Sequence, residues 1–445
     1  MIKKNMLKEY LRYILPTMLT FTLASVYSIV DGMFVGHAVG DAGVAGINVA
    51  FPLVAFVMAV GTGIGMGGGV ISSIARGAGD EAKSRRAVGT TFTLLLLAAL
   101  PVMALLLFAA EPICRLLGGQ GGTLEQAVAY TSVIAWGVPF QIFVTGCTPL
   151  IRNQGRVGFA MAVQVLAGLM NVLLDYVFVM LFGWGTAGIG IATVIAAALS
   201  AVIVVAFLMR EEGPFRLHLR ELRICGPELA GILRIGIPAG IQGAVFSLSN
   251  TVVQATINGF GSAAIAGSAA TLNFEYYTYF FVNAFGQTAV TFTGQNFAAK
   301  NADRCRAIFR WCVLFGFTSS LILGVTFTAL GTRALGLFTT DAAALSFGLV
   351  RLWFVELPDC LTTFYEVPAG AMRGMGWSTL PAVITILGSC VLRVALVTWV
   401  FPLSGTWDTL MVIYPVTWSF MIVAMLVSYF IVRRRCYRSI EPAAA

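Results

Sequence analysis

Apolar residues occur along this chain in runs long enough to cross a lipid bilayer, separated by short polar segments. A helix needs about 20 consecutive apolar residues to span the hydrocarbon core. Twelve runs of this kind are found, at residues 12–37, 44–72, 88–110, 128–150, 158–183, 187–209, 232–258, 264–293, 308–330, 343–370, 379–402 and 410–432. The pattern predicts an all-α polytopic membrane protein with twelve transmembrane helices.

The composition agrees with a membrane protein. The chain has 445 residues, of which 58% are hydrophobic and 11% are charged, whereas a soluble domain has about 25% charged residues. One globular core cannot bury this apolar excess, so we expect the lipid bilayer to surround the chain.

The basic residues are distributed unevenly between the loops. If the N-terminus is cytoplasmic, 24 of the 28 Lys and Arg residues fall in or beside cytoplasmic segments. Only Arg115 and Arg333 fall in outer loops, while Arg351 and Arg393 lie inside spans. This positive-inside distribution predicts a multi-pass protein of the plasma (inner) membrane with both termini in the cytoplasm. It also explains the net charge of +8 without a nucleic-acid partner.

The two halves of the chain share one pattern. "LRYILP" at 11–16 is repeated as "LRIGIP" at 233–238, and "RNQG" at 152–155 as "RGMG" at 373–376. Each half has six predicted helices, an even number, so the halves have the same orientation in the membrane. A parallel 6+6 repeat of this kind predicts two six-helix bundles with a cavity between them, as in transporters.

The repeat predicts a division into domains. Residues 1–209 form the N-lobe and residues 232–432 form the C-lobe. The charged segment 210–231 joins them as a cytoplasmic linker, and residues 433–445 form a basic cytoplasmic tail.

Two carboxylates lie inside the spans of the N-lobe. Asp31 and Asp175 come at about the same depth, and an ionisable residue inside a membrane is a functional candidate. Tyr27 and Asn171 each precede one of these acids by four residues, and Thr193 reaches a similar depth on the next span. These hard oxygen donors suit H⁺ or Na⁺ better than a transition metal. The alternative is that each acid only bonds a neighbouring helix.

The C-lobe carries its intramembrane charges elsewhere. They are Glu275, Arg351, Glu356, Asp359, Glu366 and Arg393. One interpretation is an internal ion-pair network that holds the lobe together. The other is a second acidic site that attracts a cationic substrate.

Aromatic residues accompany one of these acids, in the run "NFEYYTYFF" at 273–281. Tyrosine rings beside carboxylates suit flat organic cations, although ordinary packing is an alternative for any one ring. A candidate substrate cleft in the C-lobe therefore comprises Glu275, Glu356, Asp359, Tyr276 and Tyr279.

The sequence argues against catalysis. The eight cysteines form no CxxC pair, which indicates neither a disulfide framework nor a metal site. His37 and His218 are too far apart to act together, and "GTGIGMGGG" at 61–69 lacks the Lys-Ser/Thr of a phosphate loop. We therefore expect no cofactor, no enzymatic activity and transport that is not driven by ATP.

Several motifs resemble the MATE (multidrug and toxin extrusion) family, and within it the DinF/MepA-like branch. They are "VDGMFVGHAVG", "NVLLDYVFV" and "GWGTAGIGIATVIA". The resemblance implies a monomer with two six-helix bundles around a V-shaped central cleft. It implies export of amphipathic, often cationic, organic compounds in antiport with H⁺ or Na⁺. The cation site that it implies comprises Asp31, Asn171, Asp175 and Thr193, with Tyr27 adjacent.

The chain departs from the family pattern at two places. The span 232–258 lacks the acid found there in the NorM-like branch, and Tyr176 stands where the DinF-like motif has proline after its Asp. The alternative function is a flippase for lipids or lipid-linked oligosaccharides of the related superfamily, which would need a basic cleft. A channel would instead show a pore-lining pattern shared by several subunits.

Overall fold

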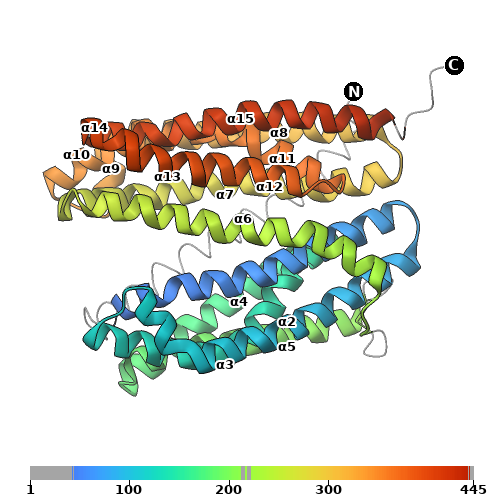
Figure 1. Cartoon of the computed structure of the whole chain (residues 1–445), viewed down its shortest axis with the longest axis horizontal. Coiled ribbons are helices and arrows are strands. Elements are labelled where there is room, and N and C mark those ends of the chain that lie inside the picture. The colour runs from blue at the N-terminus through green and yellow to red at the C-terminus, as the bar shows by residue number, and fades with distance from the viewer. Residues whose placement is uncertain (1–42, 44, 212–215, 218–221, 439, 441–445) are drawn as a thin grey trace. The chain divides into compact units, whose positions relative to one another are not determined.

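A computed structural model describes residues 43, 45–211, 216–217, 222–438 and 440. Within these residues the chain is built of helices joined by short turns, and no β-strand occurs (Figure 1). The first predicted span, at 12–37, lies outside the described residues. Tyr27 and Asp31 are therefore not placed.

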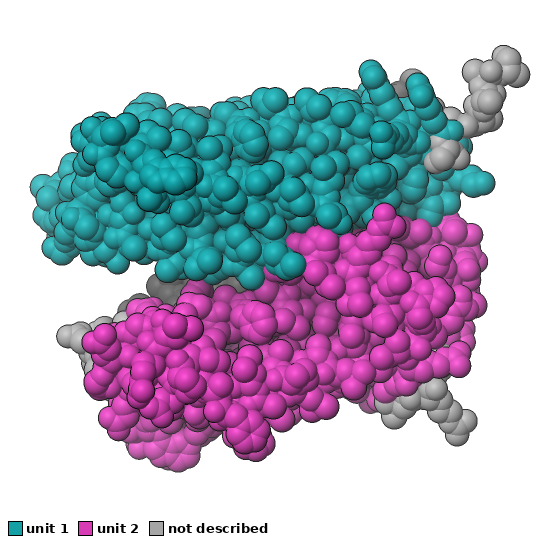
Figure 2. Space-filling view, in the orientation of Figure 1, with its two compact units in different colours: residues 1–18, 241–445 teal, residues 19–240 magenta. Residues whose placement is uncertain are grey.

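Two compact units divide the chain, one of residues 19–240 and one of residues 1–18 and 241–445 (Figure 2). We call them the N-terminal unit and the C-terminal unit. The described helices of the N-terminal unit are Ala45–Gly77, α2 (Glu81–Leu116), α3 (Gly121–Asn153), α4 (Val157–Asp175), η1 (Tyr176–Leu181), α5 (Gly185–Arg210) and the first half of α6 (Gly226–Asn258).

The C-terminal unit contains the second half of α6 and the helices that follow it. These are α7 (Ser262–Ala298), α8 (Ala302–Leu330), α9 (Thr332–Leu335), α10 (Ala342–Arg351), η3 (Leu352–Glu356), η4 (Leu357–Thr362), α11 (Thr363–Gly374), α12 (Thr379–Thr385), η5 (Ile386–Leu392), α13 (Arg393–Ala395), η6 (Leu396–Val400), α14 (Phe401–Ser404) and α15 (Trp407–Arg438). The elements from α10 to α11, and those from α12 to α14, follow one another without a break and each group forms one long helical rod.

The other eleven predicted spans each coincide with a helix or helical rod of the described residues. Nine of these described helices are long and apolar enough to cross a membrane. Helix α7 and the rod at 342–374 are not among the nine, because both carry polar residues, and the rod has five charged ones. The all-α membrane fold predicted from the hydrophobic pattern is thereby confirmed.

Matching turns show the repeat at the level of the backbone. Asp80 and Asn301 cap α2 and α8, and each side chain accepts a hydrogen bond from the backbone N–H three residues later, at 2.9 and 3.0 Å. Gly155 and Gly376, the last residues of "RNQG" and "RGMG", both have φ of +86°. Only glycine adopts this conformation freely. Both halves therefore begin corresponding helices with the same kind of side-chain cap and end them with a glycine in the same conformation.

Glycines allow the helix Ala45–Gly77 to pack closely against the first half of α6. A Cβ atom on Gly63 would lie 2.8 Å from the carbonyl oxygen of Gly236, and one on Gly236 would lie 2.5 Å from that of Gly63. A Cβ on Gly67 would overlap the carbonyl of Ile232 in the same way. The glycine-rich run that includes Gly63 and Gly67 is therefore a helix-packing surface.

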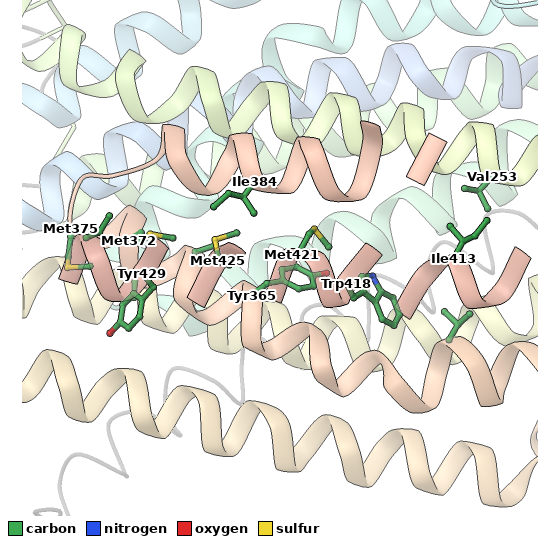
Figure 3. Packing of buried hydrophobic residues seen from close by; sticks show 14 of the residues in the cluster. Val253, Tyr365, Met372, Met375, Ile384, Ile413, Trp418, Met421, Met425 and Tyr429 are labelled. Carbon is green, nitrogen blue, oxygen red and sulfur yellow. The ribbon is translucent and has the colours of Figure 1, made fainter. Parts of the chain in front are cut away.

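The C-terminal unit has a large apolar core between α11, α12 and α15. In Figure 3, Met421 and Met425 of α15 lie close to Tyr365 of α11, and Ile384 of α12 points toward them. Tyr365 is 5% exposed and both methionines are fully buried. Glu366 and Arg393 lie within electrostatic range of Tyr365 and therefore adjoin this apolar core.

Candidate ion-coupling and substrate sites

Asp175 and Asn171 lie in the last turns of α4, inside the N-terminal unit. Asp175 is fully buried and Asn171 is 2% exposed. The four-residue spacing puts both side chains on one face of the helix. Neither amide atom of Asn171 has a hydrogen-bond partner among the described residues. A buried carboxylate therefore shares a helix face with an amide whose donor and acceptor are both available.

Thr193 lies on α5, which packs beside α4 and η1. Gly188 of α5 is in close contact with Phe178 of η1. Counting equally back along α4 and forward along α5 from this contact brings Thr193 to the level of Asn171 and Asp175. The Thr193 hydroxyl is half-buried and donates to the carbonyl of Ile189 at 3.0 Å, which leaves its oxygen available as an acceptor.

The helix changes its winding directly after Asp175. Residues Tyr176–Leu181 form a π-helix, η1, where the related motif has a proline. A π-turn widens the helix and is frequent at functional sites. The departure at Tyr176 therefore coincides with a local irregularity beside the acid, although no proline is present. Tyr27 and Asp31, the other members of the predicted cation site, lie outside the described residues.

In the C-terminal unit, Arg351 forms an ion pair with Glu275. Its Nε and Nη2 atoms donate to the two carboxylate oxygens of Glu275 at 2.5 and 2.8 Å, and Nη1 donates to Ser268 at 2.5 Å. Arg351 is 2% exposed. The two-point contact neutralises Glu275, and together with Ser268 it engages all three nitrogens of the guanidinium.

Glu356 and Asp359 form a second acidic group, which this arginine does not neutralise. Glu356 is fully buried and accepts a hydrogen bond from Thr278 at 2.5 Å, while Asp359 is 6% exposed. One carboxylate oxygen of each acid has no partner among the described residues. The two acids lie within electrostatic range of each other, where η3 passes into η4. The C-terminal unit thus holds a compact pair of carboxylates on irregular helix.

Other charged residues of this unit have separate surroundings. Arg373 is 7% exposed and donates to Gln242 at 2.5 Å, and Glu366 lies within its electrostatic range. Arg393 forms no ion pair with any described acid and is considered below. Among the described residues of this unit, Arg351–Glu275 is a buried ion pair and Arg306–Asp303 an exposed one at 2.7 Å, and the buried acids do not form a single linked network.

Of the two tyrosines assigned to the substrate cleft, Tyr276 is 52% exposed and its ring stacks near Phe280 at 6.1 Å. Tyr279 is half-buried, and its hydroxyl is hydrogen-bonded to Asn283. Only Tyr276 therefore presents an aromatic surface to a compound outside the unit.

Sequence reasoning missed several side chains that shape these sites. Ser268 and Thr278 lie seven residues before and three residues after Glu275 on α7, so helical spacing from Glu275 could have indicated them. Tyr414 of α15 contacts two arginines, but nothing in its sequence context marks it. No group of three or more His, Cys, Asp or Glu residues able to hold a metal ion occurs within the described ranges.

Comparisons with known proteins agree with this arrangement. The family model named MatE matches the chain twice, at residues 16–177 and 238–399, which confirms the internal repeat. The chain is 24% identical over 381 residues to "Probable multidrug resistance protein YoeA" of Bacillus subtilis (strain 168), covering 84% of this chain and 82% of that protein. It is 22% identical over 434 residues to "Multidrug export protein MepA" of Staphylococcus saprophyticus, covering 96% and 94%.

A solved structure has the same fold. The outward-facing conformation of a multidrug resistance MATE family transporter of the MOP superfamily superimposes with a TM-score of 0.88 at 20% identity, covering 97% of this chain and 96% of that one. Such transporters have twelve helices in two bundles and need no cofactor. The repeated family match, which spans most of the length, shows that the chain belongs to the MatE family and is a multi-pass membrane transporter rather than an enzyme.

Proposed function

We propose that this chain is a multidrug efflux transporter that exports amphipathic organic cations in antiport with H⁺ or Na⁺. The names of its relatives YoeA and MepA support multidrug export. The observation that carries the ion coupling is the burial of Asp175 beside an Asn171 amide with no partner among the described residues.

The coupling site of this proposal comprises Asp31, Asn171, Asp175 and Thr193, with Tyr27 adjacent. A carboxylate buried inside a span is unfavourable unless a proton or a cation neutralises it. Na⁺ or H⁺ bound there lowers the affinity for a cationic compound, and the compound lowers the affinity for the ion by the same factor. Export then follows from exchange of one for the other across two conformations.

The proposed substrate-binding site lies in the C-lobe. Glu356 and Asp359 supply carboxyl groups that Arg351 does not engage, because that arginine is paired with Glu275. The exposed ring of Tyr276 offers a surface on which a flat cation can stack. Glu275 contributes less than the sequence suggested, since its two oxygens are already engaged, and Tyr279 contributes mainly packing.

The decisive experiment measures export of a cationic dye from proteoliposomes. A pH gradient alone and then a Na⁺ gradient alone are imposed on the wild type and on Asp175→Asn. We expect one gradient to drive export in the wild type and the Asp175→Asn variant to lose at least about tenfold of that rate, since the ionisable group is gone. Glu111→Gln, which removes an exposed acid of the same unit, is the control and is expected to keep the wild-type rate.

Full gradient-driven export by Asp175→Asn would contradict the N-lobe site and move the coupling to the C-lobe acids. Absence of export under either gradient, in a folded and correctly oriented sample, would favour the lipid or lipid-linked oligosaccharide flippase.

We also propose the oligomeric state, the membrane and the topology of the transporter. It is a monomer of the plasma (inner) membrane with both termini in the cytoplasm, as the distribution of Lys and Arg predicts. Its lobes are residues 1–209 and 232–432, joined by the linker 210–231 and followed by the tail 433–445.

A further inference from the structure

Arg393 is a buried cation that has no acidic partner in the described part of the chain. It is 2% exposed and lies at the middle of the rod formed by α12 to α14. Within the described residues no carboxylate forms an ion pair or hydrogen bond with it. The Tyr365 phenol and the Cys390 thiol lie within its electrostatic range, and neither is an anion at neutral pH; its Cζ atom also lies over the ring of Tyr414.

The hydrogen bonds of Arg393 are long and go to neutral groups. Its Nη1 donates to the Asn250 side-chain oxygen at 3.3 Å and its Nη2 to the Thr417 hydroxyl at 3.5 Å, whereas Nε has no partner among the described residues. Charge-assisted hydrogen bonds of arginine are about 2.7–2.9 Å long. The guanidinium therefore keeps capacity for a stronger acceptor.

Arg351 provides an internal comparison, because both arginines contact the same ring. The Cζ atoms of Arg351 and Arg393 lie 5.6 and 4.8 Å from the centroid of Tyr414. Arg351 also has the two oxygens of Glu275, at 2.5 and 2.8 Å. Among the described residues, the hydrogen-bond acceptors of Arg393 are instead the neutral side chains of Asn250 and Thr417.

Arg393 lies close to the surface of the C-terminal unit, through its contact with Asn250. Asn250 is exposed on α6, and Tyr414 is half-buried on α15. Two π-helices, η5 and η6, flank Arg393 on its own rod, at Ile386–Leu392 and Leu396–Val400. Irregular winding of this kind loosens helix packing and is frequent at functional sites.

From these contacts we propose that Arg393, Asn250 and Tyr414 form a binding site for a singly charged anion, either a halide or the carboxylate group of an organic compound. The anion accepts hydrogen bonds from the Arg393 guanidinium and from the amide group of Asn250, beside the Tyr414 ring. The site is separate from the proposed coupling acid Asp175, and the proposal does not depend on drug export.

The test measures anion-dependent thermal stability of the full-length protein in detergent. Chloride or acetate replaces the bulkier sulfonate anion methanesulfonate, which is neither a halide nor a carboxylate, at constant Na⁺ concentration, and the unfolding temperature is followed by intrinsic fluorescence. We expect a saturable rise for the wild type. Arg393→Gln should raise the half-saturating anion concentration by about tenfold or more, because a hydrogen bond to a charged group is lost. A rise with chloride alone identifies an inorganic ion, and a rise with acetate identifies the carboxylate.

Asn250→Asp keeps the test decisive if Arg393→Gln does not fold. The new carboxylate lies at an exposed position beside the guanidinium and takes the place of the anion, so the anion-dependent rise should vanish in a folded protein. Gln254→Glu adds the same charge one helical turn further along α6, where Gln254 contacts Asn258, and should keep the rise. The proposal is overturned if the wild type shows no anion dependence, or if the dependence persists in Asn250→Asp.

Discussion

The charged residues inside the spans differ in how well they are satisfied. Arg351 and Glu275 are matched in charge and geometry, whereas Arg393 has only neutral acceptors and Glu356 and Asp359 keep free oxygens within the described part of the chain. Buried charges without partners are unfavourable, so chains that retain them commonly use them for function. The Arg351–Glu275 pair is therefore tested by its effect on stability, and the groups without a charged partner are tested by their effect on binding or transport.

We expect the ion pair between Arg351 and Glu275 to stabilise the folded protein. Glu275→Gln leaves the guanidinium of Arg351 buried without its counter-ion and should lower the free energy of unfolding by about 3–5 kcal/mol. Unfolding in detergent by heat or denaturant measures the loss. The double substitution Glu275→Leu with Arg351→Met should restore most of it, since apolar residues of similar volume replace such pairs well.

The exposed pair of Glu111 and Arg115 serves as the matched control, because it lies at 2.6 Å but both side chains are more than half exposed. Glu111→Gln should change stability by less than about 1 kcal/mol. An equal loss in Glu111→Gln and Glu275→Gln would show that burial does not strengthen the Arg351 pair.

The spacing of residues along a helix predicts part of the two sites. Helical spacing was enough to put Asn171 and Asp175 on one face, and both are buried as a pair on that face. It was not enough to show that Arg351 neutralises Glu275 rather than Glu356. Pairing between α10 and α7 depends on how two helices pack, and periodicity within one helix does not contain that information.

At the scale of helices, the hydrophobic pattern located each described span but not its ends. The span predicted at 88–110 is the apolar part of α2, which extends from Glu81 to Leu116. The start of α2 is set by the Asp80 cap, because the side chain satisfies a backbone N–H outside the apolar run. The π-helices beside Asp175, Glu356 and Arg393 were not predicted, because a change in helix winding leaves no mark in the hydrophobic pattern.

The close packing of α6 against the helix Ala45–Gly77 gives a prediction at this scale. Gly236→Ala puts a methyl group against the Gly63 carbonyl, so the helices must separate and the unfolding temperature should fall. Gly243 lies on the same helix with no heavy atom within 4 Å of an added Cβ. Gly243→Ala should therefore be neutral or stabilise α6, by up to about 1 kcal/mol.

Thermal unfolding of the two alanine variants in parallel checks this expectation. If both variants were equally stable, the glycine contact would not be tight in the folded protein. If both fell equally, helix packing near Gly243 would be closer than the open space around it suggests.

At the scale of the whole molecule, the distribution of basic residues predicts which loops face the cytoplasm. Gln120 lies in an exposed turn before α3, and Asp303 is exposed in the first turn of α8. In intact cells, an impermeant maleimide should label Gln120→Cys and leave Asp303→Cys unlabelled until the membrane is opened. Seven of the eight native cysteines are buried and Cys225 is half-buried, so the background should be low. The reverse labelling pattern would invert the topology.

The matching turns at Gly155 and Gly376, and the matching caps at Asp80 and Asn301, also bear on the origin of this chain. We infer that it arose by duplication and fusion of a six-helix ancestor, because short turns and caps have no reason to agree at corresponding places otherwise. The intramembrane acids do not correspond between the halves. Helix boundaries were therefore inherited from the ancestor, whereas the charges were acquired or lost after fusion, which freed one copy to specialise in ion chemistry and the other in the choice of cargo.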